Sequence, residues 1–168
     1  MSRRARRRLI TIVVIALVLI AVGVGGYAAY QASPGRPGTP APDQGNRHIQ
    51  TAGEPHEPYN TDPPTSGPHL PYIAPWGVHT RPIVPELQVH NLEDGGVLVQ
   101  YNCDCPDLAE NLKRIVVKYD KQVILAPYPT MKSRIALTAW TRIDTFDAFD
   151  EGRVRRFIEA YRGIDHHK

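Results

Sequence analysis

Cysteine is scarce in this chain, because the 168 residues include only two, Cys103 and Cys105, with one residue between them. The sequence therefore lacks the spacing of a four-ligand zinc site, such as two Cys-x-x-Cys motifs. It also lacks the Gly-x-Ser-x-Gly elbow of a hydrolase and a glycine-rich loop that cradles phosphate. These absences favour a binding protein over an enzyme.

Charge is absent from residues 9–30, which read LITIVVIALVLIAVGVGGYAAY. At ~1.5 Å per residue, about 20 apolar residues cross the hydrocarbon layer of a membrane, so this segment is predicted to be a transmembrane helix. Residues 1–8 hold five arginines and no acid, which predicts a cytoplasmic tail and a single-pass protein. The rest of the chain is then expected outside the cell membrane, in the periplasm or at the cell exterior.

A cleavable signal peptide is the alternative interpretation, because Ala28, Ala29 and Ala32 offer small residues for a cleavage site. Its apolar region has only about 7–15 residues. The uncharged segment here is longer, so a retained anchor is favoured.

The net charge of +3 belongs to the N-terminal tail, because all 17 acids and only 15 of the 20 lysines and arginines follow residue 30. The part after the predicted span is therefore close to −2. This balance gives no support to nucleic-acid binding. The positively charged arginines of the tail are expected to attract anionic lipid headgroups.

Proline divides the remaining chain, because thirteen of the sixteen prolines lie between Pro34 and Pro85. Residues 31–57 have almost no large apolar side chain to offset the entropy of ordering, so they are predicted to be an exposed, proline-rich linker. Residues 58–168 have the size of one small domain.

The pattern of that domain predicts an α+β fold with a small mixed β-sheet and two packed helices. Strands are expected at residues 95–101, 121–127 and 134–140, where β-branched and aromatic residues follow turn signals. One helix is expected to begin at Pro106 and carries an apolar stripe from Leu108 to Tyr119. A second is expected from about Asp147 to Arg162, and one or two short strands have room between residues 58 and 90.

Several motifs resemble a bacterial membrane-anchored family known as domain of unknown function 3105. They are YNTDPPTSGPH at residues 59–69, Val89-His90, Leu92–Gly96, Ala126–Pro129 and Ala136–Trp140. The resemblance covers about residues 59–161 and implies a tethered extracytoplasmic domain without an assigned activity. The family commonly has histidine at the position of Asp94. If that histidine is a metal ligand elsewhere in the family, aspartate here supplies a harder oxygen donor and changes the metal preference. Otherwise, the histidine was never a ligand.

Two of the seven histidines stand out. His69 follows Pro63, Pro64, Gly67 and Pro68, which restrict its backbone path. His90 precedes the first long strand. His48 and His56 fall in or near the expected linker, and His166 and His167 in a polar tail that is expected to be solvated. Glu93 and Asp94 form an acidic pair before a strand, where acids commonly serve solvation.

Three interpretations of the Cys-Asp-Cys motif remain open. A disulfide is the simplest state outside the cytoplasm, although a loop this short gains little entropic stabilisation. A redox pair is suggested because Cys105 stands just before a helix, as in thioredoxin-like folds, whose spacing is however Cys-x-x-Cys. As thiolates, the pair suits copper or zinc.

The leading expectation is a membrane-anchored carrier or sensor that binds a transition metal, copper before zinc. Its expected ligands are Cys103, Cys105, His69, His90, Met131 and Asp94. One alternative is a module that docks an envelope protein through its proline-rich surface at residues 59–85, where Tyr72 and Trp76 are expected to be exposed anchors. The other is a thiol oxidoreductase.

Overall fold

A computed structural model describes residues 35–167, and the folded unit begins at Pro37. The predicted cytoplasmic tail at residues 1–8 and the predicted transmembrane helix at residues 9–30 lie outside the described residues. Within residues 35–167, no helix has both the length and the apolar character needed to cross a membrane.

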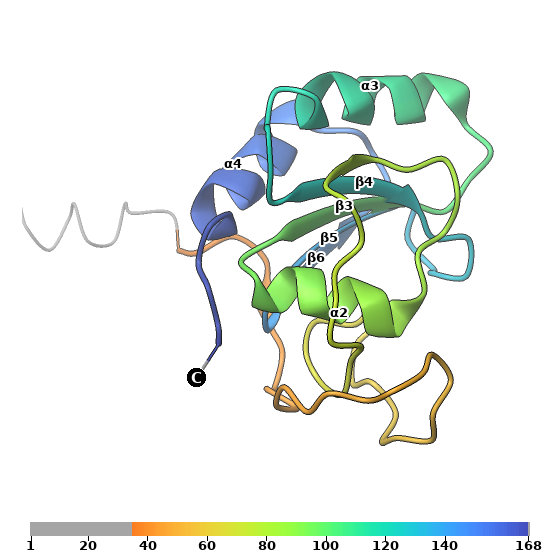
Figure 1. Cartoon of the computed structure of the whole chain (residues 1–168). Coiled ribbons are helices and arrows are strands. Elements are labelled where there is room, and N and C mark those ends of the chain that lie inside the picture. The colour runs from red at the N-terminus through yellow and green to blue at the C-terminus, as the bar shows by residue number, and fades with distance from the viewer. Residues whose placement is uncertain (1–34, 168) are drawn as a thin grey trace, which may run out of the picture. The chain divides into compact units, whose positions relative to one another are not determined.

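Six strands form one mixed sheet in the order β1-β6-β5-β3-β4-β2 (Figure 1). The centre is built from β3 (Val97–Tyr101), α3 (Pro106–Val116) and β4 (Val123–Pro127), and the two strands are parallel. β5 (Ile135–Ala139) runs antiparallel to β3, and β6 (Arg142–Phe146) antiparallel to β5. β3, β4, β5 and the helix after Pro106 lie where the sequence predicted them.

The sheet separates two layers of helices. α3 and α4 (Glu151–Tyr161) cover one face, and α2 (Pro85–Glu93) covers the other (Figure 1). Alternate residues of β3 divide between the layers, as the pleat requires. Val97 and Val99 join the core under α3 and α4, whereas Leu98 joins the core under α2. The mixed α+β architecture is confirmed.

The prediction of two packed helices is wrong, because α2 is a third. This helix buries Gln88, His90, Asn91 and Glu93 as well as Val89 and Leu92. A helix that buries polar residues between its apolar ones shows no apolar stripe in the sequence. The same burial places His90 and Glu93, two side chains that can bind a metal, inside the protein.

Residues 37–57 also differ from the exposed linker expected over residues 31–57. Thr39–Pro40 form β1 and pair with β6, and the side chain of Ile49 is only 1% exposed. The hydroxyl of Tyr161 donates to the carbonyl of Pro37. Backbone pairing and the single buried side chain of Ile49 hold this segment. Neither produces a periodic pattern of apolar residues in the sequence. The short strand β2 (Gly77–Val78), parallel to β4, lies where the sequence left room for one.

The turn from α2 into β3 depends on two glycines. Gly95 has a φ of +75°, which favours glycine, and the backbone of Ile164 packs against it. Gly96 leaves no space for a side chain beside the ring of Trp76. The amide of Gly163 donates to the carbonyl of Gly95. The segment after α4 is therefore held against the C-terminal end of α2.

Candidate metal centre

Two segments distant in sequence bring the first pair of histidines together. His48 and His69 form an isolated parallel bridge, in which the amide of Ile49 donates to the carbonyl of His69 at 2.8 Å and the amide of His69 donates to that of Arg47 at 3.0 Å. The two imidazole centroids are 5.0 Å apart. His69 is fully buried, whereas the side chain of His48 is 45% exposed.

The C-terminal half of α2 supplies the other ligand candidates. His90 and Glu93 are three residues apart, so they lie on the same side of the helix. The ring of His90 lies 5.1 Å from that of His69 and 5.3 Å from that of His48, centroid to centroid. One ligand atom from each of His48, His69, His90 and Glu93 lies within 4.8 Å of all the others. We call these four residues the His3Glu cluster.

The proton arrangement of His69 follows from its two contacts. Nδ1 lies 2.8 Å from the carbonyl oxygen of Gly67, and Nε2 lies 2.9 Å from Oε2 of Glu93. A carbonyl can only accept, so Nδ1 carries a hydrogen. In the neutral imidazole, Nε2 then has a free lone pair directed at Glu93. A backbone carbonyl that fixes the tautomer in this way is a common support for a metal-bound histidine.

The carboxylate of Glu93 occupies the middle of the site and is 1% exposed. Its Oε1 accepts from Nδ2 of Asn46 at 2.7 Å. Its Oε2 lies 3.9 Å from Nε2 of His48 in addition to its contact with His69. A buried carboxylate needs a compensating positive charge. In the described residues only histidines approach Oε2, and they are cationic only if protonated.

His90 offers a nitrogen that the protein leaves unused. Its Nδ1 is buried and has no hydrogen-bond partner, and its Nε2 lies 3.7 Å from Oδ1 of Asp94. Burial lowers the pKa of His90 below 6.5, although Asp94 opposes the shift. The ring therefore favours the neutral form, in which one nitrogen has a lone pair for a metal.

A second group lies beside the first and shares His90. Ligand atoms of His90, Asp94 and His167 also lie within 4.8 Å of one another. Nε2 of His167 is 3.5 Å from Oδ1 of Asp94 and 3.5 Å from Oε2 of Glu93. The hydrogen bond from His167 to Asp165 raises the pKa of the exposed imidazole.

The C-terminal segment covers part of the site. The amide of His166 donates to the carbonyl of Glu93 at 2.9 Å, and its ring stacks on Trp140 with centroids 5.8 Å apart. A hollow of about 30 Å³ lies here and is lined by Asp43, Gly45, Asn46, Trp140 and His166. The C-terminal segment at His166 thus lies between Glu93 and the surface.

Three of the six residues expected as ligands lie in these two groups: His69 in the first, Asp94 in the second and His90 in both. His48, Glu93 and His167 are further members of the two groups. His48 was expected in a linker and His167 in a solvated tail after the last helix, so neither was predicted to be a ligand. Long-range backbone hydrogen bonds place His48 and His167 near α2. Such contacts leave no local pattern in the sequence.

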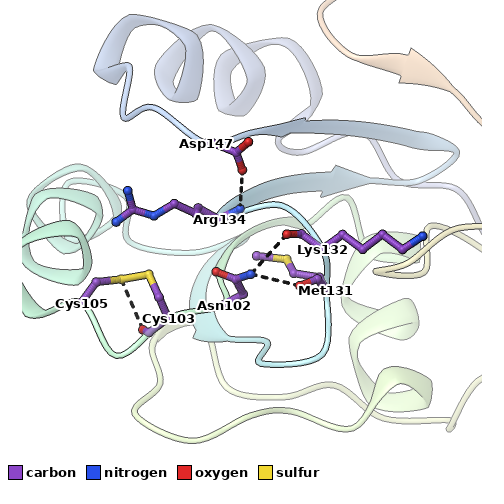
Figure 2. Close-up of a disulfide and its surroundings, with 7 residues drawn as sticks. All are labelled: Asn102, Cys103, Cys105, Met131, Lys132, Arg134 and Asp147. Carbon is purple, nitrogen blue, oxygen red and sulfur yellow. Dashed lines mark hydrogen bonds between the residues drawn. A yellow bond between two sulfur atoms is a disulfide. The ribbon is translucent and has the colours of Figure 1, made fainter.

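The three sulfur-containing residues of the expected site lie elsewhere. Cys103 and Cys105 form a disulfide (Figure 2). Both pack against the core under α3 and α4 and not against the core under α2. The side chain of Met131 is 4% exposed and packs with Tyr128 and Ala136. Within residues 35–167, neither group of candidate metal ligands includes a cysteine. Disulfide-bonded cysteines have no thiolate to offer a metal.

The aromatic residues of the proline-rich segment also differ from one another. Tyr72 is 55% exposed, as the docking interpretation expected. Trp76 instead packs against the core under α2 and is half-buried. Only Tyr72 is therefore free to anchor a partner.

Comparison with known proteins identifies one family. The model described as "Protein of unknown function (DUF3105)" matches residues 51–168, which include most of both groups of candidate ligands. No curated protein and no solved structure matches the chain significantly.

Proposed function

The chain belongs to the DUF3105 family, and on that premise we propose that it binds one divalent transition-metal ion through the His3Glu cluster. The observation that carries the proposal is the approach of three imidazoles and a carboxylate to within 4.8 Å at their ligand atoms. Ligands at about 2.0–2.1 Å from a tetrahedral ion lie roughly 3.3 Å apart. The contacts of Glu93 with His69 at 2.9 Å and with His48 at 3.9 Å bracket that spacing.

The ion supplies what the apoprotein lacks. It places positive charge beside the buried carboxylate of Glu93, and it gives a bonding partner to the largely buried ring of His90, whose Nδ1 makes no hydrogen bond. His69 needs no rearrangement of its ring, because Nδ1 is already held by the carbonyl of Gly67 and Nε2 already points to the side of Glu93.

We propose zinc as the ion, because the basis of the earlier preference for copper is gone. That preference depended on soft sulfur ligands, but Cys103 and Cys105 are joined to each other and Met131 packs in a separate core. Imidazole and carboxylate suit borderline divalent ions. Copper(II) is the main competitor, because it binds such donors more tightly than zinc does in the Irving–Williams order.

Four protein donors point to a carrier or sensor rather than a catalyst. A catalytic zinc site usually keeps one position for water or substrate, whereas a site filled by four protein ligands is closed. His48 is the exposed member, so it is the ligand through which the ion enters and leaves. The uncharged segment at residues 9–30 supports a protein anchored by a single span that presents this site outside the cell membrane.

Metal titration of the full-length chain in mild detergent tests the proposal. We expect one equivalent of zinc to bind tightly, and cobalt(II) in its place to give the intense visible absorption of a four-coordinate ion. His69→Ala should abolish both signals. The matched control is His79→Ala, because His79 lies outside both groups.

Two outcomes would sink the proposal. One is binding of zinc by His69→Ala with unchanged stoichiometry and affinity. The other is loss of binding in the control but not in the cluster variant. Changing both cysteines to serine should leave the tight equivalent in place, and this variant separates the His3Glu cluster from the sulfur site expected from the sequence.

A second candidate function, docking of an envelope protein, is favoured by two exposed side chains in the proline-rich segment. Tyr72 is 55% exposed and Val84 is 45% exposed. A hollow of about 360 Å³ lies beside Val84, with Pro82, Tyr128 and Pro129 among its lining residues. Photo-crosslinking from positions 72 and 84 in intact membranes should yield a discrete adduct. Val117 is 61% exposed and follows α3, so the same probe there is the control and should yield none.

A further inference from the structure

The disulfide between Cys103 and Cys105 is a second chemical feature, and the metal proposal does not use it. It lies in the turn between the end of β3 and the start of α3, and neither cysteine is fully buried (Figure 2). It therefore needs an explanation of its own.

Structural stapling explains the disulfide poorly. The bond joins residues separated by two positions in the sequence, and the entropy that a crosslink removes from the unfolded chain falls as the closed loop becomes shorter. Other contacts already hold the turn. The amide of Asn102 donates to the carbonyl of Arg134, and its Nδ2 donates to the carbonyl of Met131 (Figure 2). The backbone at the entrance to the turn thus keeps its position without the crosslink.

The start of α3 favours the reduced state of one sulfur. Cys105 is the N-cap residue of this 11-residue helix, and no side chain caps the helix. A disulfide sulfur is a weak acceptor, whereas a thiolate at this position interacts favourably with the unpaired amides and the positive end of the helix dipole. Asp104 and Asp107 are the acidic neighbours that oppose this effect. Cys105 is accordingly the better leaving group when the bond is attacked.

The surface beside the turn is open to another polypeptide. A hollow of about 290 Å³ runs along the first turns of α3, and Tyr101 and Pro106, which flank the cysteine turn, are among its lining residues. β2 borders the same hollow through Val78 and is the last strand at this edge of the sheet.

We propose that the Cys103–Cys105 disulfide oxidises a pair of thiols on another polypeptide. A thiolate of that dithiol attacks Sγ of Cys103, forms a mixed disulfide and expels Cys105 as a thiolate. The second thiolate of the partner then attacks its own sulfur in the mixed disulfide and releases Cys103. The partner gains one disulfide and loses two protons, and the two cysteines here gain two electrons and two protons.

The test uses the full-length oxidised protein and a synthetic peptide with two cysteines separated by two glycines. We expect one peptide disulfide to form per protein molecule, at a rate above that given by the same concentration of oxidised glutathione. Mass spectrometry after thiol alkylation counts both products. Because the wild-type chain is used, the result does not depend on whether a variant folds.

Two further measurements separate exchange from a structural role. The double variant Cys103→Ser/Cys105→Ser should oxidise no peptide and should lose little thermal stability, because its loop is short. Wild-type protein treated with a metal chelator should retain full exchange, so failure of the metal proposal leaves this one intact. A disulfide that does not react with the peptide, or a double variant that no longer folds, would overturn the proposal.

Discussion

Nε2 of His69 lies 2.9 Å from Oε2 of Glu93, and each residue is no more than 1% exposed. Nδ1 of the same imidazole must donate to the carbonyl of Gly67. A contact this short between Nε2 and a carboxylate oxygen therefore requires a further proton, either on the ring or on the acid. In the proposed metal complex, the ion would take the place of that proton.

Replacing the carboxylate tests its part in binding. Glu93→Gln keeps the size of the side chain but removes its charge, so we expect zinc affinity to fall at least tenfold. Competition with a chromophoric chelator measures this change. The control is Glu159→Gln on the exposed side of α4, which should leave the affinity as it is. Equal affinities for the two variants would exclude Glu93 as a ligand.

Proton release gives an independent test of the same pair. Zinc binding should release the proton shared by His69 and Glu93, so its affinity should rise with pH. Calorimetric titrations in two buffers with different ionisation enthalpies should give different apparent binding enthalpies, and the difference counts the released protons. Identical enthalpies in both buffers would contradict the proton arrangement derived from Gly67.

The stability of the metal-free protein should depend on pH through His90. Burial lowers the pKa of His90 in the folded state, so the unfolded chain takes up this proton at higher pH than the folded protein does. The free energy of unfolding should therefore fall as pH decreases from about 6.5 towards the depressed folded value. Well above pH 6.5, His90 is neutral in both states and makes the free energy of unfolding no more dependent on pH.

His90→Gln should make the same pH dependence shallower, because the group that titrates is removed. Urea denaturation with a chelator present, at several pH values between about 5 and 8, gives the comparison. His48, His69, Glu93 and Asp94 also act on His90, and they remain in both proteins. A steeper dependence in the variant would show that the sign is wrong.

The sequence predicted the elements whose residues alternate or repeat. β3, β4 and β5 are runs of buried aliphatic residues, and α3 buries Leu108, Leu112, Ile115 and Val116 along one stripe. It did not predict β6, because every residue of that strand is at least partly exposed. Burial of apolar side chains, as a continuous run in a strand or a stripe on a helix, is the signal that sequence patterns carry.

The candidate site was only half predictable for a related reason. His69 was identified from the prolines around it, but its contacts are made by residues 21 positions earlier and 24 positions later in the chain, His48 and Glu93. α2 gave no helical pattern because its buried side chains include polar residues that serve the site. A local pattern reports apolar packing, whereas a ligand cluster is assembled by the tertiary fold.

Neighbouring valines at the end of α3 test the core under α3 and α4. The side chain of Val116 is fully buried, and that of Val117 is 61% exposed. Val116→Ala removes two methyl groups from a packed core and should lower the free energy of unfolding by about 2 kcal/mol. Val117→Ala should change it by less than about 0.5 kcal/mol. Urea denaturation measures both, and equal losses would contradict the packing.

The cap of α4 offers a test of helix formation. Oδ1 of Asp150 accepts from the amide of Arg153 at 2.9 Å. Asp150→Ala removes this acceptor and should destabilise the protein by about 1 kcal/mol, whereas Asp150→Ser keeps an acceptor and should lose much less. Thermal denaturation of the two variants provides the measurement. Matching losses would mean that the cap bond contributes nothing.

The docking of residues 163–167 against the end of α2 has a practical consequence for protein production. Any sequence fused after this segment begins next to His90, Asp94 and His167. A polyhistidine purification handle at that end would add competing imidazoles beside the candidate ligands and could itself capture the ion. Binding stoichiometry is therefore best determined with protein that carries no appended histidines.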